Sequence, residues 1–292
     1  MSLSSRVAVV IVTYNSADVV LGALSALGSD LHDRVVVVDN ASTDDTCEVI
    51  TAAAPAVRVC RSSTNLGFGS AVNVGTRQTP PADYVLVLNP DAQIDPGDLL
   101  RLVDHLDTHP RSGVVVPRLW RAGSPLCSAK RRPRLLTELW PVAPAALMPH
   151  LPTSSLDPSF AISGPVEVVE GACMLLRREA FDAVGGFDEG YFLYFEEADL
   201  AKRLSQLGWT CDLCAEARAE HLVGDSRKQV PYGAAPHFVS STVRYLQKWE
   251  PRSRARAYVV FARLSWSVRR RWGGLEPALA AAFRAALPDA RP

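Results

Sequence analysis

The chain has 292 residues, of which 48% are hydrophobic and 21% are charged, and its 31 Lys and Arg residues balance 31 Asp and Glu residues. This composition is typical of a globular protein and is too apolar for a disordered one. No run of about 18 consecutive apolar residues occurs, so no transmembrane helix is expected. Residues 1–6 lack a signal-peptide pattern, and the six cysteines are too scattered for a disulfide framework. A reducing, cytoplasmic compartment is therefore expected.

The balanced charge is unevenly distributed along the chain. Residues 226–292 contain 13 Lys and Arg residues against three acidic residues, and residues 1–225 carry a compensating excess of acids. This separation predicts an acidic body and a basic tail that contacts an anionic surface such as a membrane. The acidic body argues against a nucleic acid as partner.

Short apolar runs alternate with helical patterns over the first 120 residues. The expected strands are residues 7–12, 34–38, 57–60, 84–88 and 114–116. The expected helices are residues 17–27, 44–54, 71–78 and 97–109. Buried β-branched runs separated by helices predict an α/β fold, Rossmann-like, with a mostly parallel central sheet flanked by helices.

The remainder of the chain has a different pattern. Residues 121–166 contain eight prolines and a basic cluster at 130–132, which predicts a loop-rich insertion. A β-rich stretch at 166–177, a helix at 178–184, a helix at 196–207 and a strand at 209–215 are expected after it. The C-terminal tail, residues 226–292, is expected to be helical and basic. We therefore expect one domain over residues 1–225, with the insertion at 121–166, and a helical C-terminal extension over 226–292.

Polar side chains follow three of the expected strands. Thr13, Asp39, Asn89 and Asp91 stand where these strands end, and ligands of parallel sheets bind at that edge. The Asp39 carboxylate can accept hydrogen bonds from a nucleotide base or from ribose hydroxyls, although an Asp/Asn turn also explains the residues after it. Asn89 and Asp91 offer oxygen ligands for Mg²⁺ or Mn²⁺.

A glycine-containing turn lies between the third strand and the helix after it. Asn65, Gly67, Phe68 and Gly69 form this turn, and Asn73 follows one helical turn later. The glycines permit close backbone approach to a ligand and leave N–H groups that suit phosphate or ribose. Two glycines are also common in ordinary strand-to-helix turns.

Three acidic residues open the helix expected at 196–207. Glu196, Glu197 and Asp199 follow a segment rich in aromatic residues. One or two of them suit the helix dipole, but a partly desolvated carboxylate here would have a raised pKa and could act as a general base. His221 has a metal or phosphate role only if other site residues lie near it.

In this order and spacing, the motifs resemble the inverting family 2 glycosyltransferases with a GT-A fold, particularly the bacterial rhamnosyltransferase-like branch. The likeness spans roughly residues 7 to 225. It is carried by the segments at 9–15, 38–44, 65–69, 88–91, 170–172, 185–189, 195–199 and 208–209, together with Arg203.

The resemblance implies roles for these residues. A nucleotide-sugar donor would be held by Thr13, Tyr14, Asn15, Asp39, Asn65, Gly67, Phe68, Gly69, Asn73 and Asn89. The acceptor side would include Glu170, Gly171, Ala172 and Trp209. Asp91 and His221 would hold Mg²⁺ or Mn²⁺. Glu197 would be the catalytic base, with Asp199 and Glu196 as rivals because Glu197 stands where the family usually has Asp.

The resemblance also implies the reaction. A base would deprotonate an acceptor hydroxyl, which attacks the sugar with inversion. The donor would be dTDP-L-rhamnose and the acceptor a polyprenyl-diphosphate-linked glycan, with UDP-galactofuranose or UDP-N-acetylglucosamine as alternative donors and a non-catalytic nucleotide-sugar binding module as an alternative function. The enzyme would lie on the inner face of the plasma membrane, held there by its basic tail. The sequence defines no oligomeric state.

Overall fold

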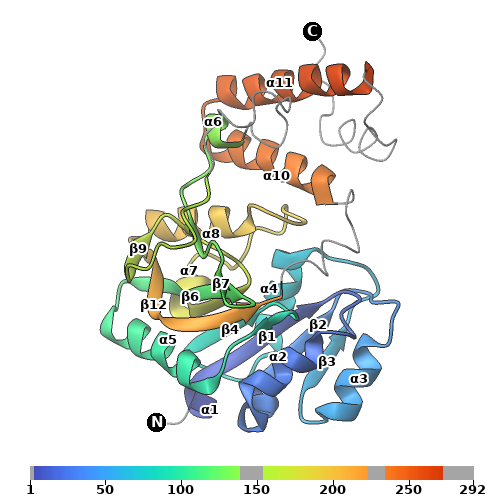
Figure 1. The fold of residues 1–292 in the computed structure, drawn as a ribbon, viewed down its shortest axis with the longest axis vertical. Helices are drawn as coiled ribbons and strands as arrows, with labels where there is room; N and C mark the ends of the chain where they lie inside the picture. Colours follow the sequence, from blue (N-terminus) through green and yellow to red (C-terminus); the bar gives the residue numbers. More distant parts are fainter. Residues whose placement is uncertain (1–2, 139–153, 223–233, 272–292) are drawn as a thin grey trace.

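The computed structural model describes residues 3–138, 154–222 and 234–271, of which 234–236 and 263–271 are described as helical backbone only. Figure 1 shows an α/β body, with two long C-terminal helices stacked on one side of it. These helices are α10 (Ala234–Trp249) and α11 (Arg252–Arg271). No helix among the described residues is long and apolar enough to cross a bilayer.

The N-terminal half of the sheet is parallel, as expected. Its strands are β1 (Val7–Thr13), β2 (Val35–Asp39), β3 (Arg58–Arg61) and β4 (Tyr84–Leu88), in the order β3-β2-β1-β4. All the neighbours pair in parallel. Thr13 is in register with Asp39, so both side chains stand at the carboxyl edge of the sheet.

The other half of the sheet is mixed. Strand β11 (Cys173–Arg177) lies antiparallel between β4 and β6 (Ser112–Arg121). β12 (Thr210–His221) is parallel to β6, and its last residues pair with the short β5 (Ala92–Gln93). The expected parallel pairing is therefore found among the first four strands and again between β6 and β12, whereas the pairings of β11, β5 and the short strands of the insertion at 121–166 are antiparallel. β12 also extends six residues beyond the expected strand end at 215.

The insertion at 121–166 contributes short elements to this half. They are β7 (Ser124–Pro125), β8 (Ala129–Lys130), α6 (Leu135–Glu138) and β9 (Gly164–Val166). β8 pairs with β10 (Val168–Val169) in a separate two-stranded sheet. The described part of the insertion is thus fastened to the body by strand pairing.

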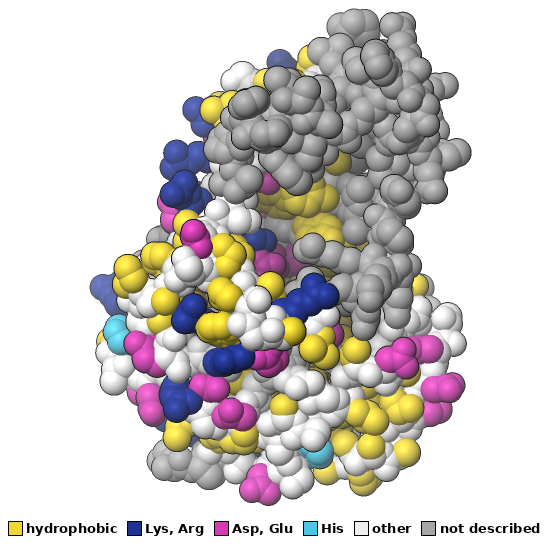
Figure 2. Space-filling model, in the orientation of Figure 1, with side chains coloured by type: hydrophobic (Ala, Val, Ile, Leu, Met, Phe, Trp, Pro, Cys, Tyr) yellow, Lys and Arg dark blue, Asp and Glu magenta, His cyan; other side chains and the backbone are white. Residues whose placement is uncertain are grey.

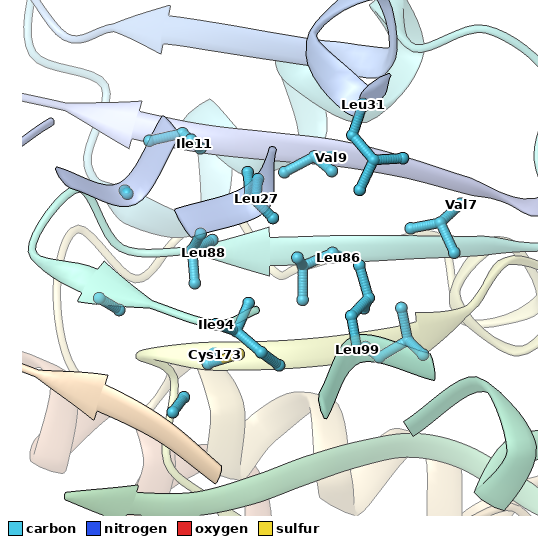
Figure 3. Packing of buried hydrophobic residues seen from close by; sticks show 14 of the residues in the cluster. Val7, Val9, Ile11, Leu27, Leu31, Leu86, Leu88, Ile94, Leu99 and Cys173 are labelled. Carbon is cyan, nitrogen blue, oxygen red and sulfur yellow. The ribbon is translucent and has the colours of Figure 1, made fainter. Parts of the chain in front are cut away.

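Helices cover both faces of the sheet (Figure 1). One face carries α2 (Val20–Leu27), α3 (Thr46–Ala53) and α5 (Pro96–Thr108); the other carries α4 (Phe68–Gln78), α7 (Arg178–Ala183) and α8 (Glu196–Gln206). The elements α1 (Leu3–Arg6) and η1 (Ser29–Arg34) precede β1 and β2. Figure 3 shows Val9 and Ile11 of β1 packed with Leu27 of α2 in the core of the first face.

Two helices begin later than the sequence predicts. α2 starts at Val20 rather than 17 because residues 16–19 form a turn, in which the Val19 N–H donates to the Ser16 carbonyl oxygen. α3 starts at Thr46 rather than 44 because the Asp44 carboxylate accepts from Ala17 and Thr46 and lies before the helix.

The C-terminal extension packs directly against the body. Phe238 and Tyr245 of α10 contact Phe195, the residue before α8. Buried Tyr258 of α11 packs with Leu246 of α10, and α11 also contacts α6. The helical tail is thus confirmed over residues 234–271, and its residues 226–233 and 272–292 lie outside the described part.

Candidate active site

Asp39 is the centre of a buried hydrogen-bond network at the carboxyl edge. Its Oδ1 accepts from the hydroxyls of Thr13 (2.9 Å) and Ser42 (2.5 Å), and its Oδ2 accepts from the Ser42 backbone N–H (3.0 Å). Because a carboxylate oxygen can accept two hydrogen bonds, Oδ2 retains acceptor capacity for a ligand. Thr13 lies opposite Asp39 on the neighbouring strand, and its hydroxyl therefore orients the Asp39 carboxylate.

The loop after β1 joins this network. Asn15 has a left-handed backbone (φ 49°), and its Oδ1 accepts from the Thr43 N–H, which fastens the loops after β1 and β2 to each other. Tyr14 between them is 43% exposed at the rim. The geometry thus makes Asn15 a support for the two loops and leaves the Tyr14 ring available to a ligand.

The glycine turn contacts the protein itself. Gly67 has φ 82°, and a Cβ there would lie 2.3 Å from the Phe192 carbonyl oxygen. A Cβ on Gly69 would lie 2.9 Å from Phe187. The close approach that these glycines permit in the structure is therefore to the 187–192 loop, and their contact with a donor stays a prediction. Asn65 caps the turn by accepting from the Gly67 N–H.

Asn73 is also committed within the fold. Its amide donates to the Phe187 carbonyl and to Glu189, and its Oδ1 accepts from the Phe187 N–H. The side chain is only 6% exposed. The expectation of direct donor contact is corrected, because every polar atom of Asn73 is used to hold the loop after α7.

Asp91 and His221 meet although 130 residues separate them. Strand pairing sets His221 opposite Ala92, and His221 Nε2 lies 3.3 Å from Asp91 Oδ1. That contact lacks hydrogen-bond geometry, so Asp91 Oδ1 is buried without a hydrogen-bond partner. No cluster of three or more metal-ligating side chains occurs among the described residues. An unpartnered carboxylate oxygen beside an imidazole suits a divalent cation that takes its remaining ligands from substrate and water.

Asn89 links this pair to the predicted acceptor side. The Asn89 N–H donates to the Ala172 carbonyl, which continues the β4–β11 pairing. Gly171, the residue before Ala172, lies against the Glu197 side chain of α8, since a Cβ on Gly171 would clash with Glu197 Oε1. The turn at 89–91 and the first turn of α8 are therefore joined by residues 170–172.

Glu197 is held between a cation and another acid. Lys130 Nζ forms an ion pair with Glu170 Oε2 at 2.5 Å. Burial raises the pKa of Glu197 to about 7; Lys130 lowers this pKa and Glu170 raises it. A carboxylate with a pKa near neutrality on the active edge is suited to act as a general base.

The two rivals of Glu197 are in different environments. Glu196 is 2% exposed, and burial next to Glu197 raises its pKa well above the usual range. Asp199 is fully buried and accepts from Arg203 Nε (2.7 Å) and Trp249 Nε1 (2.8 Å), with Lys248 Nζ also at 2.7 Å. Asp199 is thus an anchor of α8, and the expectation of it as an alternative base is corrected because its oxygens are occupied.

Trp209 lies apart from the other predicted acceptor residues. It follows the C-terminal end of α8, whereas Glu197 opens that helix. A Cβ on Gly113, at the start of β6, would be 3.1 Å from Trp209, and the Arg177 guanidinium lies 6.0 Å from its ring. The structure therefore does not bring Trp209 together with Glu170, Gly171 and Ala172.

Three residues of the site were not predicted as such. Lys130 was expected only within a basic cluster, and Lys248 and Trp249 only within the tail. No local pattern identifies them, because their partners are 40 or more residues away. The only signal in the sequence was the opposite charge of two segments, the basic residues 226–292 and the acids that open α8.

The chain has clear relatives. Residues 8–185 match the family described as Glycosyl transferase family 2. The N-acetylglucosaminyl-diphospho-decaprenol L-rhamnosyltransferase of Mycobacterium tuberculosis is 35% identical over 73% of this chain and 75% of its own. The rhamnosyltransferase WbbL of Escherichia coli is 26% identical over 82% of this chain and 92% of its own.

Solved structures share the fold. A mannosyltransferase from Pyrobaculum calidifontis, in complex with GDP-Man and Mn²⁺, aligns with a TM-score of 0.56 over 96% of this chain and 79% of its own, at 18% identity. Residues 1–349 of S. aureus TarS, in complex with UDP-GlcNAc, give a TM-score of 0.54 over 97% of this chain and 79% of that one, at 18% identity. With the family match over residues 8–185, this chain belongs to glycosyl transferase family 2 and is a glycosyltransferase of the GT-A fold.

Proposed function

We propose that this glycosyltransferase moves L-rhamnose from dTDP-L-rhamnose to an N-acetylglucosamine carried on a polyprenyl diphosphate, with inversion at the sugar. The observation that carries the proposal is the 35% identity over 73% of the chain to the mycobacterial enzyme of that name. The E. coli rhamnosyltransferase, matched over 82% of this chain, supports the same sugar. Such a product would serve cell-wall or surface polysaccharide synthesis.

The donor is assigned to the edge formed by β1, β2 and β4. Asp39 Oδ2 would accept from the pyrimidine, and the exposed Tyr14 ring would contact the nucleoside. Asn65 and Phe68 line the same side at the start of α4, where the helix dipole favours phosphate. Asn89 stands at the end of β4 beside the diphosphate position.

Glu197 is assigned as the base. It would take the proton from the acceptor hydroxyl while that oxygen attacks C1 of the sugar and the nucleoside diphosphate leaves from the opposite face. The residues 170–172 flank Glu197 and would position the acceptor sugar. Lys130 and Glu170 set how readily the Glu197 carboxylate holds a proton.

Asp91 and His221 are assigned to a divalent cation, Mg²⁺ or Mn²⁺. The unpartnered, buried Asp91 Oδ1 and the nearby imidazole fit such an ion. When bound, the ion would supply positive charge that stabilises the departing diphosphate. Turnover should therefore be lost in excess EDTA and in an Asp91→Ala variant, and full turnover of that variant in EDTA would contradict the assignment.

The tail is assigned to the cytoplasmic membrane surface, in a narrower form than the sequence suggested. Arg244, Lys248 and Trp249 bond to acids of the body, so the charges of Arg244 and Lys248 are already partly balanced within the protein. Arg252 and Arg256 of α11 are exposed and remain candidates. Co-sedimentation with vesicles should require anionic lipid and weaken with salt. Equal binding to neutral vesicles would contradict electrostatic docking.

The donor and acceptor are tested together by turnover. Purified enzyme is assayed with dTDP-L-rhamnose, UDP-galactofuranose and UDP-N-acetylglucosamine, each with a prenyl-diphosphate-linked N-acetylglucosamine, and the product is detected by mass. We expect a glycosylated product with dTDP-L-rhamnose and none with either UDP-sugar. A product from either UDP-sugar alone would overturn the assignment of the sugar.

A further inference from the structure

A large cavity extends along α8 on the side of the insertion. Its volume is about 1430 Å³, and it is lined by side chains from residues 130–137, residues 156–167, α8, the start of β12 and the start of α11. Figure 2 shows the surface hollowed between the body and the upper helices, with hydrophobic and charged side chains inside the hollow. The proposed donor, metal and base sites share only Lys130 with the lining of this cavity.

The lining of the cavity is both basic and apolar. Its basic residues are Lys130, Arg131, Arg132, Arg134 and Arg254, against the acids Glu167 and Glu250. Apolar side chains, among them Leu136, Phe160 and Trp209, line the same space. A lining of this kind suits a molecule with an anionic group attached to a hydrocarbon chain.

Three of these arginines lack acidic partners within the described part of the chain. Arg254 bonds to Glu250 and Lys130 to Glu170, but Arg131, Arg132 and Arg134 form no described side-chain ion pair. Arg132 Nε is buried and has no hydrogen-bond partner. A buried guanidinium N–H without an acceptor is costly, and an anion in the cavity would relieve that cost.

The cavity starts one helical turn along α8 from the proposed base, Glu197, which is not itself among the lining residues. Glu197, Ala201 and Ser205 are spaced four residues apart and form one row on α8, and the last two line the cavity. Four residues of helix rise about 6 Å, which is comparable to the length of one sugar ring. An acceptor sugar with its hydroxyl at Glu197 would therefore extend its linked group into the cavity beside Ala201.

We propose that this cavity binds the diphosphate and the first prenyl units of the acceptor. The proposal rests on the proposed function. Arg132 and Arg134 hold the diphosphate by charge-assisted hydrogen bonds. The prenyl chain lies over Leu136 and Phe160 towards Trp209. The basic cluster of the insertion is thus the part of the enzyme that distinguishes a lipid-linked sugar from a free one.

A phospholipid headgroup shares this chemistry, and the experiment separates the two sources. The test variant is Arg132→Ala combined with Arg134→Ala, and the control is Arg77→Ala, an exposed arginine of α4 outside the cavity. Transfer is measured in detergent with two acceptors, N-acetylglucosamine on a short prenyl diphosphate and an alkyl N-acetylglucosaminide. Binding to vesicles of anionic phospholipid is measured in parallel.

We expect the KM for the diphosphate acceptor to rise tenfold or more in the double variant, with kcat and the donor KM unchanged. The alkyl glycoside should be used equally by wild type, double variant and control. An unchanged KM for the diphosphate acceptor, or an equal rise for both acceptors, would overturn the proposal. So would loss of vesicle binding in the double variant without any change in KM, because the cavity would then serve the headgroup.

A direct binding measurement separates this proposal from the proposed function. Farnesyl diphosphate alone is titrated calorimetrically into wild type, the double variant and Arg132→Lys, whose thermal midpoints show that each is folded. We expect the Kd to rise tenfold or more in the double variant and to be partly restored by the lysine. This result stands even if no rhamnose is transferred, whereas equal Kd values overturn the cavity assignment even if rhamnose is transferred.

Discussion

The charge state of Glu197 depends on two neighbours of opposite sign. Lys130 and Glu170 form an ion pair at 2.5 Å, and both act on the Glu197 carboxylate. Burial is the largest influence and raises the pKa of Glu197 to about 7. Because Lys130 and Glu170 have opposite charges, removing each one separately should change the pKa of Glu197 in opposite directions.

Replacing Glu197 with Gln should abolish the proton transfer while preserving the shape of the site. We expect kcat to fall by about 10² to 10⁴, the usual range for loss of a general base, with the donor KM unchanged. Steady-state kinetics measure both. Normal turnover of this variant would reject Glu197 as the base, and Glu197→Asp provides the conservative control.

The acid limb of the pH profile should move in opposite directions in two variants. The base works only when deprotonated, so the rate should fall as pH drops through about 7. Lys130→Met removes a cation that lowers the pKa of Glu197, and should move this limb to higher pH. Glu170→Gln removes an anion that raises it, and should move the limb to lower pH. Shifts of the same sign in both variants would contradict this electrostatic account.

At the scale of elements, α5 and β12 are joined by a buried ion pair. His105 Nε2 lies 2.9 Å from Asp212 Oδ2, and both side chains are at least nine-tenths buried. The hydrogen bond to Asp212, with a second side-chain hydrogen bond to Cys214, raises the pKa of His105 to about 9. The ring of His109 stacks on that of His105 at 4.1 Å.

This pair should make stability fall at alkaline pH. Because the pKa of His105 is raised by folding from about 6.5, its contribution is complete below pH 6.5 and is lost as pH rises through about 9. Urea unfolding should show wild type losing about 3 kcal/mol between these pH values, and Asp212→Asn losing little. A parallel decline in both proteins would show that other groups cause the loss.

The sequence predicts strands better than their directions and partners. β1, β2 and β4 lie close to the expected ranges. Short continuous runs of β-branched residues are typical of strands that are buried on both faces of a parallel sheet. β11 runs antiparallel because the insertion returns the chain from the opposite side, and no local pattern encodes that path. Likewise, the glycines of the turn at 65–69 indicated close approach but not to which atoms.

At the scale of the whole molecule, the charge separation between body and tail is partly neutralised internally. Asp188 accepts from Arg244 and Lys248, and although burial raises the pKa of Asp188, these bonds lower it to about 2. Lys248 and Trp249 also reach Asp199. The sequence showed the opposite charges of the two parts, but it could not show that they meet, because such pairing is fixed only by the packing of α10.

Removing the partners of Asp199 should affect folding and catalysis together. Lys248→Met combined with Trp249→Phe leaves a fully buried carboxylate with fewer donors, and we expect a loss of about 3 kcal/mol in unfolding free energy. Because Asp199 anchors the first turn of α8, kcat should also fall. Gln247→Ala, an exposed change on α10, is the matched control for urea unfolding and kinetics. Unchanged stability would show that Arg203 alone suffices.

The backbone just before α8 has a consequence for how the protein is made. Tyr194 and Phe195 are both left-handed, with φ 69° and 70°, which costs about 1–2 kcal/mol for each residue. Phe238 packs against both rings, and Ser241 Oγ donates to the Leu193 carbonyl. On the ribosome, where the N-terminal part of a chain folds first, these contacts form only after α10 has emerged. The strands β1 to β4 can therefore be complete while the turn that carries Glu197 still lacks these contacts, so on a nascent chain the proposed donor edge would form before the proposed base is fixed.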